Sequence, residues 1–195
     1  MKTNCRKLSL RWKILIPVTF LLVLAIVTLC GSAGRRLESG MTEVGSEEAL
    51  LAAKVAIKDI NGNSLANLKI GDEETPEYQE ILEDLVSLKE YIDIEYLYTL
   101  YTDGNKVYYG VDADTSEEQC SIGEEFSMSY EELKKAFEGN EYPEIEIAKE
   151  EDLYLLTSYV PIKDDSGKVV AVLGCDYNAN HLVEEISSTK LSLYT

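Results

Sequence analysis

Tyrosine is the residue type in this sequence that could line a binding site. The chain of 195 residues has 13 tyrosines but only 3 phenylalanines. Tyr96 and Tyr98 alternate with Leu97 in a segment rich in β-branched and aromatic residues, so both rings lie on one face of the expected strand. A tyrosine offers an apolar ring and a polar hydroxyl group, which suits a pocket for a small polar ligand. A sheet core whose hydroxyl groups reach the surface explains the same pattern, and both interpretations stay open.

Asp112 and Asp176 each end an expected strand and could supply charge to such a pocket. A strand-end aspartate also commonly caps the following turn, and for Asp176 that turn would lie near Asn178. Arg35 and Arg36 are the only arginines after residue 34, and both adjoin the apolar N-terminal segment. A ligand carboxylate would need an inward arginine, so the sequence favours a small ligand that is cationic, zwitterionic or neutral.

The sequence contains no catalytic motif of a common hydrolase, metalloprotease or nucleotide-binding enzyme. Gly-x-Ser-x-Gly, His-Glu-x-x-His and Gly-x-x-x-x-Gly-Lys-Ser/Thr are all absent. The only histidine, His181, falls at a polar helix start, where a solvated or capping residue is usual. The 36 acidic residues leave a pair of carboxylates at hydrolase spacing open. We expect a protein that is not an enzyme, with no catalytic residues and no cofactor.

Metal-ligand patterns are weak. Oxygen-bearing side chains over Asp112–Glu118 resemble the start of a calcium loop, but Glu117 occupies the position of the required glycine and Gly123 that of the final glutamate. No Cys-x-x-Cys or Cys/His cluster is present, so we expect no metal site. Cys120 and Cys175 are expected to be free thiols, with a disulfide as the alternative.

The charge of the chain is strongly asymmetric. Its 18 basic and 36 acidic residues give −18 overall. Residues 1–34 carry five basic residues and no acid, so residues 35–195 carry a net charge of −23. Such a surface excludes binding of nucleic acid through a basic groove. A hydrophobic content of 45% excludes a disordered chain, and residues 35–195 are enough for one domain with its own core.

An uncharged apolar segment predicts a membrane span over residues 14–34. At ~1.5 Å per residue these 21 residues cross a hydrocarbon core of roughly 30 Å. The basic residues of the preceding tail, residues 1–13, place the N-terminus in the cytoplasm and residues 35–195 outside the cell membrane. A cleavable signal peptide ending near Gly31–Ala33, or a lipoprotein signal at Cys30, would leave residues 35–195 on the same side. The apolar run is long for a signal peptide, which favours the uncleaved anchor.

A membrane-proximal helix is expected over residues 35–61. Seven positions alternate four and three apart along it, as in a coiled-coil seam: Leu37, Met41, Val44, Glu48, Leu51, Val55 and Lys58. This stripe either packs on its own domain or forms the seam of a homodimer, and the sequence does not decide between them. We expect a homodimer.

Further elements over residues 62–180 indicate an α+β fold with a five-stranded antiparallel sheet and flanking helices. The expected helices are Pro76–Tyr91, capped by Thr75, and Ser129–Phe137, with a Ser129/Glu132 capping box. The expected strands are Ile94–Thr102, Lys106–Asp112, Glu144–Ala148, Leu153–Lys163 and Lys168–Asp176, and Asn61-Gly62-Asn63 is expected to be a turn. Residues 181–195 are expected to form a last helix.

Three of these segments together resemble a known family. They are the hairpin IEYLYTLYTDGNKVYYGVD, the loop Ile122–Glu124 and the closing hairpin SYVPIKDDSGKVVAVLGCD. The combination resembles the extracytoplasmic Cache sensor domain, a PAS-like fold of bacterial chemoreceptors, sensor histidine kinases and nucleotide cyclases, over roughly residues 37–190. The chain departs from the family at Asp152–Leu155, where members often carry Asp-x-x-Gly.

The resemblance implies a ligand site between the sheet and the segment after the second strand. In amine-binding Cache domains an acid near the end of the last strand meets the ligand's ammonium group, and Asp176 falls at about that place. The implied ligand-binding residues are Tyr96, Tyr98, Tyr109, Asp112, Tyr130, Tyr159 and Asp176.

The resemblance also implies a function. The chain is expected to be the ligand-sensing part of a bacterial transmembrane receptor, first of all a chemotaxis receptor, with a second membrane span and a signalling domain after residue 195. The sensor region of a histidine kinase or a nucleotide cyclase is the alternative. A membrane-anchored extracellular enzyme or adhesin is the alternative of another class.

Overall fold

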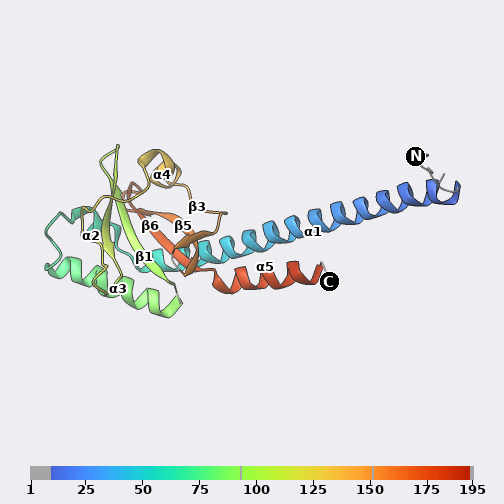
Figure 1. The fold of residues 1–195 in the computed structure, drawn as a ribbon. Coiled ribbons are helices and arrows are strands. Elements are labelled where there is room, and N and C mark those ends of the chain that lie inside the picture. The colour runs from blue at the N-terminus through green and yellow to red at the C-terminus, as the bar shows by residue number, and fades with distance from the viewer. Residues whose placement is uncertain (1–9, 93, 151, 194–195) are drawn as a thin grey trace, which may run out of the picture. The chain divides into compact units, whose positions relative to one another are not determined.

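The computed structural model describes residues 10–92, 94–150 and 152–193 (Figure 1), so part of the expected cytoplasmic tail lies outside the described residues. The helices are α1 (Leu10–Ala56), α2 (Gly62–Asn67), α3 (Pro76–Ile92), α4 (Tyr130–Phe137) and α5 (Asn180–Leu193), with a 3₁₀ turn at Ile57–Asp59. The strands are β1 (Tyr96–Thr102), β2 (Val107–Asp112), β3 (Tyr142–Pro143), β4 (Ala148–Glu150), β5 (Leu153–Lys163) and β6 (Val169–Asn178).

The described residues fall into two compact units, residues 41–184 and residues 10–40 with 185–193. The second unit contains the apolar part of α1. Its most apolar 18 residues have a mean hydropathy of 2.7, and none of them is buried. By length and composition this helix can cross a membrane, as the sequence predicts.

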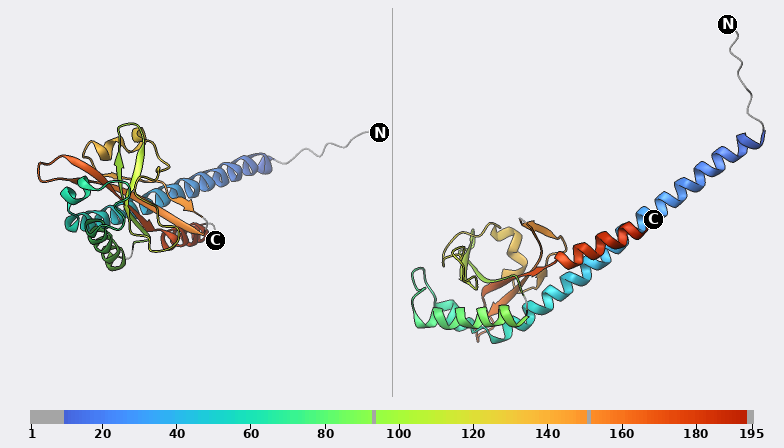
Figure 2. Two further views of the ribbon diagram at one scale, coloured as in Figure 1. Left: turned by 90° about the vertical axis from the view of Figure 1, so that its left-hand side faces the viewer. Right: turned by 60° about the horizontal axis from the view of Figure 1, so that its bottom comes forward.

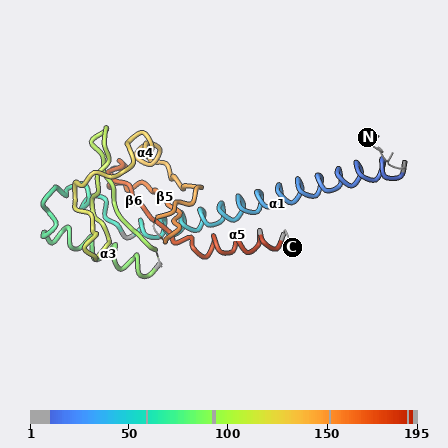
Figure 3. Tube along the Cα trace, in the orientation of Figure 1, coloured from blue at the N-terminus to red at the C-terminus, as the bar shows by residue number. Residues whose placement is uncertain are grey.

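All neighbouring strands of the sheet are antiparallel, in the order β2-β1-β6-β5-β3, with β4 also paired to β5. The last strand, β6, therefore lies in the middle, between β1 and β5 (Figure 3). The predicted turn between β5 and β6 is held by the Asp164 carboxylate, which accepts hydrogen bonds from the N–H groups of Ser166 (2.9 Å) and Lys168 (3.0 Å).

The sheet separates two core layers. Leu97, Leu173 and Cys175 face a layer that includes residues of α1 and α3, whereas Tyr98 and Val172 face a layer that includes Leu133 of α4. Figures 1 and 2 show α3 and α4 on opposite sides of the strands. The α+β class with an antiparallel sheet and flanking helices is therefore confirmed.

The end of α1 packs on the sheet with its smallest residues. Ala49, Ala53 and Ala56 are fully buried. A Cβ atom at Gly45 would lie 2.7 Å from Leu182 Cδ2, so only glycine fits there without a shift. By contrast, the predicted stripe is exposed at Val44 (57%), Leu51 (63%) and Val55 (36%). The alternative that these three side chains pack on their own domain is therefore wrong, because the helix packs on the sheet through its alanine face instead.

The strand predicted over Glu144–Ala148 is wrong. Pro143 pairs with Ser158 and Ala148 pairs with Leu155, so four residues, 144–147, face only two on β5. The excess forces the chain away from the sheet between β3 and β4, which is why the sheet has six strands instead of five.

The predicted turn at Asn61–Asn63 is instead the start of α2. The Asn61 side chain accepts hydrogen bonds from the N–H groups of Asn63 (3.0 Å) and Ser64 (3.3 Å), which is an N-cap. The residue types are those of a turn, but the chain continues from them into a helix.

Helix α4 begins as predicted, and this gives a first test. Glu132 Oε2 accepts hydrogen bonds from both the N–H and the hydroxyl group of Ser129, each at 2.7 Å. Ser129→Ala removes the cap and should cost about 1 kcal/mol, a fall in melting temperature of roughly 2–4 °C. Thermal unfolding followed by near-ultraviolet circular dichroism of the tyrosines measures it. Ser129→Thr, which keeps the hydroxyl group, should leave the melting temperature almost unchanged; equal losses in the two variants would show that the cap is not the cause.

Candidate functional site

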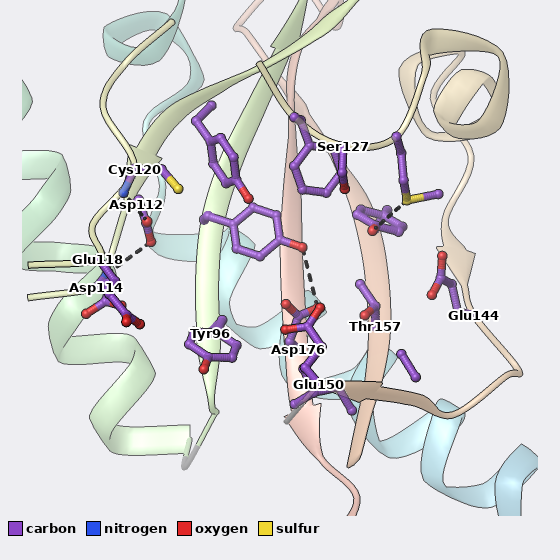
Figure 4. A pocket seen from close by; sticks show the side chains of 17 residues that line it. Tyr96, Asp112, Asp114, Glu118, Cys120, Ser127, Glu144, Glu150, Thr157 and Asp176 are labelled. Carbon is purple, nitrogen blue, oxygen red and sulfur yellow. Dashed lines mark hydrogen bonds between the residues drawn. The ribbon is translucent and has the colours of Figure 1, made fainter. Parts of the chain in front are cut away.

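A cavity of about 400 Å³ opens on the face of the sheet that carries α4. Strands β1, β2, β5 and β6 form its floor, and the segments 113–128 and 142–150 form its sides (Figure 4). Six of the seven site residues expected from the sequence line this cavity together: Tyr96, Tyr98, Tyr109, Asp112, Tyr159 and Asp176. Tyr130 is not among the lining residues, because its ring packs against Phe137 on the same helix (5.8 Å between centroids).

Tyr98 lies at the centre of the cavity and owes its place to Gly174. The two residues are paired across β1 and β6, and a Cβ atom at position 174 would overlap the Tyr98 ring. The ring also contacts Tyr109 edge-on (5.6 Å between centroids) and Phe126 (5.7 Å). Aromatic contacts of this kind stabilise beyond their buried area by roughly 0.5–1.5 kcal/mol each, so this wall is held in place.

Asp176 is the buried charge of the site. Only 9% of the residue is exposed, and it lies on β6 between Tyr96 of β1 and Thr157 of β5. The Tyr98 hydroxyl donates a long hydrogen bond of 3.4 Å to Asp176 Oδ1. Burial raises the pKa of Asp176 to about 7, hydrogen bonds from Thr157 and Tyr98 act against the shift, and the charges of Glu150 and Glu144 add to it.

The charged side chains that line the cavity are acidic. Six carboxylic acids line it: Asp112, Asp114, Glu118, Glu144, Glu150 and Asp176. None of the described lining residues is basic. Lys89 lies over the Tyr96 ring, 5.6 Å from its centroid. The N–H group of Ser116 lowers the pKa of Asp114 with help from the Lys89 charge, whereas burial raises the pKa of Asp112 against that charge. Among the described residues, the lining of the cavity thus carries charges of one sign only, and its interior is negative.

Asp112 fastens the loop that follows β2. Its carboxylate accepts hydrogen bonds from the N–H groups of Asp114 (3.0 Å) and Cys120 (2.9 Å). The Gln119 side chain closes the same loop on the carbonyl group of Asp112 (2.8 Å). The acidic run that resembles a calcium loop thus forms turns on its own backbone, and the part of the chain that the structure describes holds no group of three or more residues suited to a metal ion.

Several lining residues were not expected from the sequence. Thr157 could have been found, because it alternates with Tyr159 on the same strand. Phe126 and Met128 belong to a loop without periodicity; the Tyr159 hydroxyl contacts the Met128 sulfur at 3.2 Å. Glu144 lies in the bulge that the strand prediction missed.

Comparison with known proteins identifies the fold. No sequence family and no curated protein matches the chain. Among solved structures, the sensor domain of DcuS from E. coli is similar with 16% identity and a TM-score of 0.53, over 75% of this chain and 98% of that one. The sensor domain of the V. cholerae histidine kinase DctB is similar with 11% identity and a TM-score of 0.58, over 80% and 58%.

The ligand-binding domain of the Campylobacter jejuni chemoreceptor Tlp3, in complex with 4-methylisoleucine, matches with 16% identity and a TM-score of 0.46, over 78% and 62%. The chain thus spans less than two thirds of the length of this receptor domain and of the DctB domain. The similarities to the DcuS and DctB sensor domains show that this chain shares the fold of those domains, which agrees with the fold expected from the sequence.

The raised pKa of Asp176 predicts a pH dependence. Because the folded-state pKa lies above that of the unfolded chain, the contribution of this group is fully present below about pH 4 and is lost as the pH rises to about 7. Asp176→Asn should remove this loss and make the unliganded protein more stable than the parent at pH 7–8. The difference in unfolding free energy between the two should change by up to about 1.4 kcal/mol per pH unit.

Thermal unfolding of the full chain in detergent between pH 4 and 8 measures this difference. The matched control is Asp84→Asn, which removes an exposed acid of α3 outside the cavity. If Asp176→Asn follows the pH profile of the control, Asp176 has the ordinary pKa of an aspartate in the folded protein.

Proposed function

We propose that residues 41–184 are the extracytoplasmic ligand-sensing domain of a membrane-anchored receptor, and that the cavity binds a small cationic molecule. The observation that carries the proposal is Asp176, a nine-tenths buried carboxylate that faces a cavity in which none of the described lining residues is basic. An isolated buried charge is costly, and a ligand cation would offset this cost through charge-assisted hydrogen bonds.

The tyrosine wall supports the same ligand class. A cation next to Asp176 would also lie near the rings of Tyr96 and Tyr98, which line the same part of the sheet (Figure 4). A desolvated cation–π contact is worth roughly 0.5–2 kcal/mol. Among the described lining side chains, the polar groups that a ligand carboxylate would meet are acids, hydroxyl groups, the Cys120 thiol and the Met128 thioether.

The class of receptor is proposed in the order expected from the sequence, a chemotaxis receptor first. The likeness to the DctB sensor domain, at a TM-score of 0.58, favours a sensor histidine kinase as the second candidate. The DcuS and DctB domains to which the chain is similar are sensor domains, which supports a role without catalysis. The apolar part of α1 supports a membrane anchor, with residues 35–195 outside the cytoplasm.

Ligand binding predicts a thermal shift. A cation at 100 times its dissociation constant should stabilise the protein by about 2.7 kcal/mol, which raises the melting temperature by roughly 5–11 °C for this size of domain. A screen of amines, amino acids, carboxylates and sugars against the full chain in detergent would reveal it. Asp176→Asn should abolish the shift, and Asp84→Asn should keep it. A screen in which only carboxylates register would overturn the charge assignment.

We also propose that the receptor is a homodimer, with the exposed stripe of α1 as its seam. Val44, Leu51 and Val55 leave an apolar surface on one side of this helix, opposite the alanine face that packs on the sheet. A membrane anchor would raise the local concentration of two such helices.

Replacement of both Val44 and Leu51 by aspartate should abolish association, because it places like charges in the seam. Sedimentation of the full chain in detergent measures the mass. Tyr91→Asp, at a side chain that is 86% exposed on α3, should leave the dimer intact. A dimer that survives the double change would place the seam on another surface.

A further inference from the structure

The bulge between β3 and β4 places one of the six acids, Glu144, on the wall of the cavity. Glu144 is the first residue of this bulge and lines the cavity, whereas its neighbours Ile145 and Glu146 are exposed and do not. Its backbone is tied on both sides: the N–H group donates to Thr157 O (2.8 Å), and the carbonyl group accepts from the Ser46 hydroxyl group of α1 (2.7 Å). The position of Glu144 is therefore fixed by the fold.

The acids of the cavity form two groups, which differ in how far neighbouring groups offset their negative charge. Figure 4 shows Asp112, Asp114 and Glu118 to one side of Tyr96, and Asp176 with Glu150 to the other. In the first group, Asp112 and Asp114 accept backbone hydrogen bonds and feel the charge of Lys89.

In the second group, Asp176 accepts side-chain hydrogen bonds from Tyr98 and Thr157, but no basic residue is among the described residues that line the cavity. Glu150 and Glu144 each repel the charge of Asp176, and Glu144 itself is half-buried, so its pKa is raised by burial and by Glu146 and Glu132. Three acids thus share one region, and a single ammonium group offsets only one of them. A zwitterion would bring its own carboxylate into the same field.

We propose that the cavity is built for a ligand with two positive charges, a linear diamine, with Asp176 and Glu150 receiving one ammonium group and Glu144 the other. This inference rests on the proposed function and narrows its ligand class. Thr157 and Tyr159 lie on the strand next to the bulge and also line the cavity, so a hydroxyl-bearing floor lies beside both charge positions. A volume of about 400 Å³ is ample for a short aliphatic chain with two amino groups.

Titration calorimetry tests the inference with α,ω-diaminoalkanes of three to six carbons and the n-alkylamines of the same lengths, on the full chain in detergent at pH 7.5. At least one diamine should bind ten or more times more tightly than its monoamine. Glu144→Gln should weaken binding of that diamine far more than binding of the monoamine, so that the tenfold preference is lost. The control Glu146→Gln removes the same charge two residues away, outside the cavity, and should keep the preference.

The outcomes separate the two proposals. If neither amine binds, the proposed function fails. If mono- and diamines bind equally, or if Glu144→Gln and Glu146→Gln weaken diamine binding alike, the cavity takes a single cation and only the present inference fails. Calcium or magnesium ions that bind and compete with the diamine would overturn it in favour of a metal site. Melting curves of each unliganded variant show whether the fold is intact.

Discussion

The contact between the Tyr98 ring and Gly174 sets the geometry of the whole site. At position 174 of the central strand β6, only glycine leaves room for the ring, since any Cβ atom there would overlap it. With the ring in this place, the Tyr98 hydroxyl group reaches Asp176, which lies two residues after Gly174 on β6. The central tyrosine and the buried charge of the cavity therefore come from the paired strands β1 and β6.

This arrangement lowers the stability of the domain without ligand. A carboxylate with nine-tenths of its surface buried and no cationic partner among the lining residues is unfavourable in the empty domain, and hydrogen bonds from Tyr98 and Thr157 offset only part of that cost. The other face of the same strand carries Leu173 and Cys175, which are fully buried beneath α1 and α3. Strand β6 therefore contributes apolar packing on one face and a buried charge without a cationic partner among the described lining residues on the other. The stability gained from the packing offsets the cost of burying the charge.

Much of the fold could be predicted from the sequence, because short-range rules decide it. Alternation of tyrosine and leucine at Tyr96–Tyr98 placed the strand and its cavity-facing side, and Ser129 with Glu132 placed the start of α4. The bulge at 144–147 could not be predicted, since it follows from the register of two separate strand pairs on β5. The loop residues Phe126 and Met128 have no periodicity, so only the folded chain brings them to the tyrosines.

Helix α1 holds both the sheet and the bulge at 144–147, because its alanine face packs on the sheet and Ser46 bonds to Glu144. Its alanine face is buried on the sheet, where Ala49 O receives a long contact from the Cys175 thiol (4.0 Å). On the same helix, Ser46 holds the carbonyl group of Glu144, and Lys54 pairs with Glu141 at 2.7 Å across the surface. An exposed ion pair contributes little, roughly 0–1 kcal/mol, so the Ser46 hydrogen bond is the stronger link. The side of the cavity that carries Glu144 is thus attached to the helix and cannot shift without breaking a hydrogen bond to α1, whereas the side that carries Asp112 closes on its own loop.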